Sequence, residues 1–362
     1  RKIWIALSCL VFSVLLGWFV AVFVKNVPIN LNVILEFGSF VISIVIFVLV
    51  LFYTKNDQIY AKKYFYALLA PTFYIIFILF HGMSNYFNFN LNSHFLGFTG
   101  NPNMISKILL IPALFFITNA LFELRNKWLK VGYIFISSAL VALLFWVASR
   151  GGLVSLIISS IFIWLVFSFH NFNWKKLFSN GIIIFFIFLI GFSMVPYSRK
   201  QAVVNRALNT IVGQSVFFSE KDKSKDIVIG KPNKDQFVEP RLSIWPFYLR
   251  YVLVNPLGIG PNTHMNFGLT DSNGEYLNLG PHNTYIQIWL WGGLLGLLSF
   301  LYILFSAFKN LKIKLQSNFN STVAALVGIL FALSIAIMFD DSLSSYWFFI
   351  VLALSLKNTI TN

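Results

Sequence analysis

The 362-residue sequence has little charge and almost no cysteine. Charged residues make up 11% of it, whereas a soluble domain carries about 25%. The single cysteine, Cys9, excludes an intrachain disulfide, and no zinc or haem motif is available. The sequence also contains no P-loop and no GxGxxG signature. These absences remove the usual sequence signals for metal, haem and nucleotide binding.

Hydrophobic residues are abundant instead, at 58% of the chain with a mean hydropathy of +0.77. A helix crosses a bilayer with about 17–25 mostly apolar residues, and its backbone satisfies its own hydrogen bonds there. The sequence therefore predicts an all-α, polytopic transmembrane helical bundle with about ten spans. The predicted spans are 3–24, 31–53, 64–81, 103–122, 129–148, 151–169, 179–196, 283–308, 322–340 and 342–357.

The basic residues between these spans predict their orientation. Fourteen Lys and Arg lie in alternate connections, which we assign to the cytoplasm, and the short outer connections hold only Lys25, Lys107 and Arg150. This distribution is a strong positive-inside pattern, which supports the number and the orientation of the predicted spans. The net charge of +15 then reports orientation and contact with anionic membrane lipid. We expect no nucleic-acid partner.

The topology divides the chain into three parts. Residues 1–196 form a bundle of seven spans, residues 197–282 a large periplasmic loop with short helices, and residues 283–362 a bundle of three spans. The charged tract at 218–238 lacks periodicity and favours a solvated, mobile loop. The chain starts at Arg1 without Met, and we expect it to be truncated at its N-terminus.

The second outer loop, residues 81–103, is uncharged and rich in Asn and aromatic residues. Its aromatics are typical of an interfacial belt, and its Asn side chains could instead contact sugar hydroxyls.

Ionisable residues are almost missing from the middle of the spans, and Glu36 lies near the outer end of its helix. A transporter usually places acids or His near the bilayer midplane. The polar groups of this sequence gather at the outer surface, which favours an enzyme that works at the membrane–water interface. A flippase or exporter is the alternative from another class, and it needs a polar pathway that the spans lack. A purely structural membrane scaffold is a third hypothesis. It gives no reason for Arg150, Arg241 and His282 to share one face of the membrane.

Arg150 lies between Ser149 and Gly151-Gly152 in a tight outer turn. Its guanidinium could bind a phosphate bidentately, and the glycines would let a head group approach the backbone. An Arg that extends to lipid phosphates is the equally supported alternative.

Arg241 begins a segment too short to span the membrane, which we interpret as an interfacial helix. Arg241 and Trp245 are four residues apart and share one face, whereas Arg250 lies on the opposite face. Arg241 is the candidate for the site. A surface stack of Arg241 on Trp245 is the alternative.

His282 and Asn283 stand at the start of the eighth predicted span, after Gly280-Pro281. The positive end of a helix dipole disfavours imidazolium, so a neutral His282 is available as a general base. A purely structural His is the alternative. Gly292 and Gly296 form a GxxxG pair, which is typical of close helix packing.

At these residues the sequence resembles the O-antigen ligase and polymerase superfamily. His282-Asn283 with Gly293 and Gly296 fit the ligase pattern in full, and Arg241 with Trp245 resembles an earlier segment of the family's periplasmic loop. The segment Asn255-Pro256-Leu257-Gly258-Ile259-Gly260 belongs to that resemblance, and Ser149-Arg150-Gly151 and Asn101-Pro102-Asn103 fit it more weakly. Family members usually have about two more spans at the N-terminus.

The resemblance implies a metal-independent glycosyltransferase that uses no nucleotide sugar and no other cofactor. Its donor is a glycan on undecaprenyl pyrophosphate at the periplasmic face. An O-antigen ligase passes that glycan to lipid A core, in lipopolysaccharide biosynthesis. An O-antigen polymerase, the alternative, passes it to another lipid-linked repeat. The implied catalytic residues are His282 as base, with Arg241 and Arg150 on the pyrophosphate. Trp245, Asn283 and Asn103 complete the expected substrate-binding set.

Overall fold

The computed structural model describes the helical parts of the chain. It covers residues 2–24, 31–54, 63, 65–70, 73, 102–122, 126–147, 149–169, 174–195, 197, 200–201, 241–261, 280–317, 319–340 and 346–356. Within these residues there is no strand. The helices are α1 (Lys2–Phe19) with the π-helical turn η1 (Val20–Val24), α2 (Leu31–Thr54), α5 (Pro102–Phe122), α6 (Lys127–Val147), α7 (Arg150–Phe169), α8 (Trp174–Ser193), α10 (Arg241–Val254), α11 (Thr284–Ser317), α12 (Ser321–Ala336) with the 3-10 turn η4 (Ile337–Phe339), and α13 (Tyr346–Leu356).

The prediction of an all-α, membrane-spanning bundle is confirmed. Eight of the described helices are long and apolar enough to cross a bilayer, and each corresponds to one of the ten predicted spans. The last predicted span is the 11-residue helix α13, which is shorter than the predicted range 342–357. The third predicted span, 64–81, lies mostly outside the described residues. The same is true of the charged tract 218–238 and of the Asn-rich loop up to residue 101.

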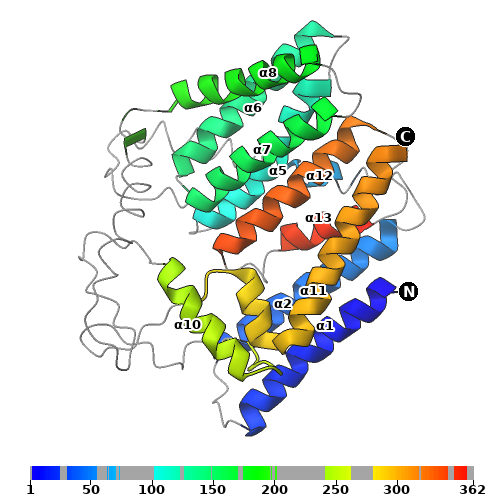
Figure 1. Ribbon diagram of the computed structural model, residues 1–362, viewed down its shortest axis with the longest axis vertical. Coiled ribbons are helices and arrows are strands. Elements are labelled where there is room, and N and C mark those ends of the chain that lie inside the picture. The colour runs from blue at the N-terminus through cyan, green and yellow to red at the C-terminus, as the bar shows by residue number, and fades with distance from the viewer. Residues whose placement is uncertain are drawn as a thin grey trace. The chain divides into compact units, whose positions relative to one another are not determined.

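The chain forms two compact units (Figure 1). Unit one contains residues 1–43, 204–305 and 337–344. Unit two contains residues 44–203, 306–336 and 345–362. The division into three parts along the sequence remains a prediction.

Unit two is built around α5 and α12, the most enclosed of its long helices. Helix α5 packs against α6, α7 and α12, and α12 also packs against α7 and α13. Helix α8 lies over α6 and α7 and exposes large apolar side chains such as Phe178, Phe185 and Leu189. Exposed side chains of this size are suited to contact with lipid, because acyl chains are as apolar as they are.

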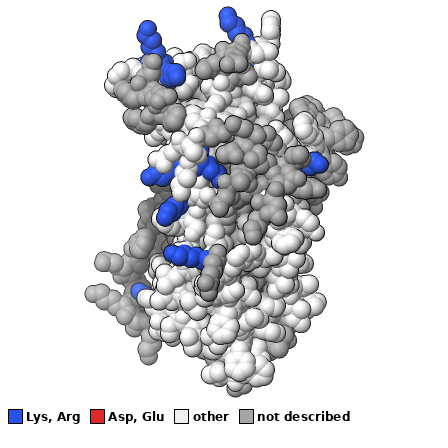
Figure 2. Space-filling model, turned by 90° about the vertical axis from the view of Figure 1, so that its right-hand side faces the viewer, with Lys and Arg blue, Asp and Glu red and all other residues white. Residues whose placement is uncertain are grey.

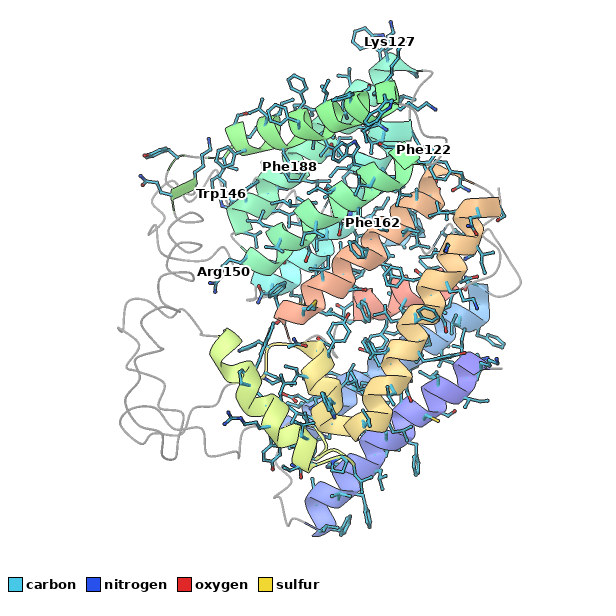
Figure 3. The ribbon with its side chains drawn as sticks, in the orientation of Figure 1. Phe122, Lys127, Trp146, Arg150, Phe162 and Phe188 are labelled. Atoms are coloured by element: carbon cyan, nitrogen blue, oxygen red, sulfur yellow. The ribbon has the colours of Figure 1, made fainter. Side chains whose placement is uncertain are left out.

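One end of unit two carries most of its described lysines. Phe122, Phe167 and Phe319 bring the ends of α5 and α7 to the start of α12, with ring centroids 4.1 to 5.3 Å apart. The basic residues in or beside the helix ends on this side are Lys127, Lys130, Lys175, Lys176, Lys309, Lys312 and Lys314. Figure 3 shows Lys127 and Phe122 at this end and Arg150 at the opposite end of α7. The described surface in Figure 2 is mostly white, with Lys and Arg in several separate places and no Asp or Glu in view.

Lys107 differs from the expected pattern. The loop charges placed it with the outer connections, but it lies inside α5, in the second turn, and is buried. The end of α5 that carries Lys107 is still the end at which α7 begins, because Ser106 contacts Ser149. The opposed positions of Arg150 and the lysine-rich end therefore agree with the predicted charge topology.

Cysteine labelling can test this topology. In a Cys9→Ser background, Arg150→Cys and Lys176→Cys should be accessible from opposite sides of the membrane. The physical reason is that α7 separates the two positions by about 30 Å, at 1.5 Å per residue. The measurement is modification by a membrane-impermeant maleimide in intact and in permeabilised cells. Equal labelling of both positions in intact cells would contradict the predicted spans.

Candidate functional site

The start of α11 is held by a network in unit one that leads directly to His282. Asn283 caps the helix: its Oδ1 accepts hydrogen bonds from the backbone N–H of Tyr285 at 3.0 Å and of Ile286 at 3.2 Å. The next hydroxyl, Thr284 Oγ1, donates to the backbone oxygen of Asp340 at 2.8 Å. Both side chains are buried. The cap therefore fixes the residue that follows His282, as expected for a helix start.

His282 itself has an unusual backbone conformation. Its φ is 45°, and no other non-glycine residue in the described part of the chain has a positive φ. This region is rarely adopted by L-residues, costs on the order of 1–3 kcal/mol, and is concentrated at functional sites. The side chain is half-buried. The surrounding contacts therefore hold a strained histidine partly exposed at the end of a membrane helix.

Trp245 supplies one of these contacts from α10. Its indole N–H donates to the backbone oxygen of Pro281, the residue before His282, at 3.0 Å. The polar atom of Trp245 is thus used to position the histidine loop. Sequence reasoning assigned Trp245 and Asn283 to substrate binding, and in the structure their polar groups also support the backbone on either side of His282.

The same hydrogen bond places the start of α10 at the start of α11. Arg241 precedes Trp245 by one helical turn, so its backbone lies on the His282 side of unit one. Pro246 lies inside α10, which runs unbroken from Arg241 to Val254. Arg250 is exposed. Burial raises the pKa of the Tyr251 hydroxyl above its ordinary value.

Helix α11 is broken in its middle. Gly293 has φ 63° and ψ −165°, a conformation open essentially to glycine alone. It lies nine residues after Thr284, in a helix that is long and apolar enough to cross a bilayer. Backbone groups freed inside such a helix must be satisfied by protein, because lipid offers no hydrogen bonds.

The segment that follows α10 satisfies them. The N–H of Ile259 donates to the oxygen of Leu290 at 2.7 Å, and the N–H of Gly260 donates to the oxygen of Trp291 at 3.1 Å. In return, Leu294 N–H donates to the oxygen of Pro256 at 3.0 Å. These three bonds replace the intrahelical bonds lost at the break. The segment 255–260 is therefore part of the membrane helix's hydrogen bonding.

Glycines make this approach possible. A Cβ on Gly258 would lie 2.5 Å from the backbone N of Gly293, and one on Gly260 would lie 2.6 Å from the Cα of Trp18. Helix α1 closes the other side, where Ser13 Oγ would be 2.6 Å from a Cβ on Gly292 and 2.9 Å from one on Gly296. The interpretation of the GxxxG pair as a close packing site is confirmed.

Arg150 lies in unit two, at the first position of α7. Ser149 caps this helix: its Oγ accepts from the backbone N–H of Gly152 at 3.3 Å and donates to Asn103 Oδ1 at 2.9 Å. Ser106 Oγ lies 3.1 Å from the Ser149 hydroxyl. The network ties the start of α5 to the start of α7, and the Arg150 side chain is half-buried at that end (Figure 3).

Gly152, the second glycine after Arg150, has a packing role. A Cβ on Gly152 would lie 2.5 Å from the Cβ of Ser106, so this glycine allows α5 and α7 to pack closely. From the sequence, we expected this glycine to let a substrate head group approach the backbone. Asn103, expected to bind substrate, uses its Oδ1 to hold Ser149 and so supports the residue before Arg150.

The predicted site residues therefore lie in two groups. Trp245, His282, Asn283 and the backbone of Arg241 are together in unit one, and Arg150 and Asn103 are together in unit two. The convergence of Arg150 with Arg241 and His282 remains a prediction. In the part of the chain that the structure describes, no group of three or more His, Cys, Asp or Glu could hold a metal ion.

Comparison with known families adds one match. Residues 134–301 match a family described as O-antigen ligase, which confirms the resemblance found in the sequence. The matched range is a little under half of the chain, and it includes Arg150, Arg241, His282 and Gly293 but not Asn103. No curated protein matches the chain.

Gly293→Ala tests the role of the broken helix. A methyl group there would collide with the backbone oxygen of Pro256 and require a disallowed φ, so we expect a loss of at least about 1–3 kcal/mol of stability. The measurement is thermal unfolding of the purified protein in detergent. The matched control is Gly38→Ala in α2, where a Cβ meets nothing within 4 Å. Equal unfolding temperatures for the two variants would contradict the assignment.

Proposed function

We propose that this chain, whose residues 134–301 match the O-antigen ligase family, transfers a glycan from undecaprenyl pyrophosphate to a sugar hydroxyl. The reaction takes place at the periplasmic face of the bacterial inner membrane. The preferred acceptor is lipid A core, which makes the chain a ligase. Joining of lipid-linked repeats, the polymerase reaction, uses the same donor chemistry and is the alternative.

The observation that carries this proposal is the strained His282 at the start of α11. Trp245 fixes the residue before it and Asn283 caps the helix after it. A histidine held this way can take a proton from an acceptor without reorganising its own backbone. Preorganisation of this kind is what an efficient general base requires.

The proposed reaction is a single displacement. His282 removes the proton of the acceptor hydroxyl as that oxygen attacks the anomeric carbon of the donor sugar. A carbon–oxygen bond forms to the acceptor, and the bond from the sugar to the pyrophosphate breaks. Undecaprenyl pyrophosphate leaves with the electron pair.

Arginines stabilise the leaving group in this proposal. Arg241 and Arg150 each offer a planar guanidinium that binds phosphate oxygens bidentately. Charge that develops on the pyrophosphate in the transition state is thereby neutralised without a metal ion. The lipid tail of the donor lies between helices. Asn103 and Asn283 support the residues beside Arg150 and His282 in this scheme, through the hydrogen bonds described above.

Export of lipid-linked glycans is the weaker alternative. It needs a polar path across the bilayer, and the middle of α11 is closed by backbone hydrogen bonds and packed glycines instead. His282, the one described non-glycine residue with a positive φ, is at a helix start, where an interfacial enzyme would use it.

Variants of His282 and Arg241 test the mechanism. His282→Ala should lower glycan transfer by about 10²–10⁴-fold, the usual loss of a general base, and should still bind the donor. Arg241→Ala should weaken donor binding as well as transfer, and Arg241→Lys should restore little because Lys lacks the bidentate fork. The measurements are donor binding and transfer by purified variants in nanodiscs.

Two further variants control for folding. His282→Asn keeps a residue that tolerates positive φ, so it should be as inactive as His282→Ala while it unfolds at the wild-type temperature. Arg250→Ala removes an exposed Arg from the same helix and should leave binding and transfer unchanged. Full transfer by both His282 variants would remove this residue from the chemistry.

A further inference from the structure

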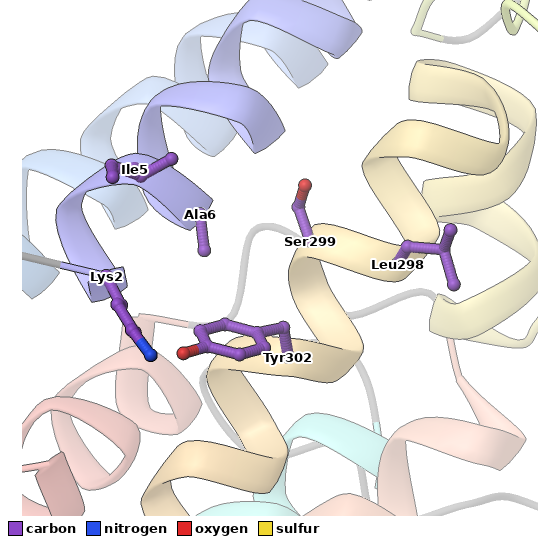
Figure 4. Close-up of a pocket in the computed structure, with 6 residues that line it drawn as sticks. All are labelled: Lys2, Ile5, Ala6, Leu298, Ser299 and Tyr302. Carbon is purple, nitrogen blue, oxygen red and sulfur yellow. The ribbon is translucent and has the colours of Figure 1, made fainter.

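A small groove in unit one lies between the first turns of α1 and the part of α11 beyond its break (Figure 4). Its volume is about 330 Å³, and its lining residues are Lys2, Ile5, Ala6, Leu298, Ser299 and Tyr302. None of the lining residues takes part in the hydrogen bonds described around His282.

The lining combines one positive charge with hydroxyls and apolar walls. Figure 4 shows the Lys2 ammonium and the Tyr302 hydroxyl pointing toward one another at one end of the groove. Ser299 is buried along its wall, whereas Ile5 and Leu298 are more than half exposed. Among the described residues that line the groove, none is acidic. The ammonium of Lys2 and the hydroxyls of Ser299 and Tyr302 can donate hydrogen bonds to the oxygens of a phosphate. The apolar walls suit the carbon chain of a phosphate ester.

The groove also lies at the depth where a bilayer places such a group. Lys2 directly precedes the apolar run of α1, and α1 carries no other Lys or Arg. A lysine at the end of a span extends its ammonium to the head-group layer while its stem covers apolar surface. Basic pockets between membrane helices on the cytoplasmic side bind the head groups of anionic lipids. By the charge topology, Lys2 is on that side.

We propose that this groove binds the head group of an anionic phospholipid, with Lys2 and Tyr302 on the phosphate and the acyl chains along the exposed faces of α1 and α11. The volume fits a glycerophosphate head group, while the chains remain outside the groove in the bilayer. The exposed Ile5, Leu298 and Tyr302 form the apolar margin that they would follow. This site is independent of the proposed glycan transfer.

Lipid titration followed by native mass spectrometry tests the proposal. The full chain in detergent is titrated with phosphatidylglycerol, and the first bound lipid is counted. Lys2→Ala should weaken that binding about fivefold, the effect of one basic residue at an anionic membrane surface. Tyr302→Phe, which removes only a hydroxyl, should weaken it by a smaller factor. Phosphatidylcholine, whose choline offsets the phosphate charge, should bind more weakly and lose less affinity in Lys2→Ala than phosphatidylglycerol does.

Matched controls separate this site from general attraction. Lys312→Ala removes an exposed lysine from the end of α11, outside the groove, and should leave the first binding event unchanged. Millimolar inorganic phosphate should not displace the lipid, because free phosphate gains nothing from the apolar walls. Equal losses in Lys2→Ala and Lys312→Ala, displacement by inorganic phosphate, or equal binding of phosphatidylcholine would each overturn the proposal.

Discussion

The break in α11 is the constraint on which the first unit depends. A helix that opens at Gly293 exposes backbone groups at a depth where lipid cannot satisfy them. The segment 255–260 enters the break and pairs with Leu290, Trp291 and Leu294. That pairing requires glycine where the two backbones meet, and it leaves α1 in contact with the same region through Ser13. A short run of irregular backbone thus joins three membrane or interfacial elements.

The geometry at the start of α11 follows from this pairing. Because the end of α10 is joined to the middle of α11, its first turns lie beside the first turns of α11. Trp245 can therefore reach the Pro281 carbonyl. The hydrogen bond, the Asn283 cap and the Thr284–Asp340 contact together restrain His282 in a conformation that costs free energy by itself. The fold therefore holds His282, the proposed general base, in a strained backbone conformation.

The sequence predicted the spans and their polarity well, because hydrophobic length and loop charge are properties of single segments. Eight spans, the close packing at Gly292 and Gly296, and the helix start at His282-Asn283 could be derived this way. The break at Gly293 could not be predicted from hydropathy, since the run stays apolar through it. Trp245 and Asn103 were assigned to substrate binding. In the folded chain, Trp245 also bonds to a residue 36 positions away and Asn103 to a residue 46 positions away, and no local sequence pattern predicts such pairs. Ser149 before a helix start was a readable cap signal that the sequence analysis did not use.

The broken α11 and the strained His282 both serve the proposed reaction, in which the chain passes lipid-linked glycan to lipid A core. The most direct measurement is a lipopolysaccharide gel of a strain that lacks the chain, with and without a plasmid copy. The account predicts bare core together with lipid-linked polymer in the deletion strain, and restoration of polymer on core by the plasmid. Core that bears a single repeat would identify a polymerase instead, and full-length polymer on core without the chain would contradict the account.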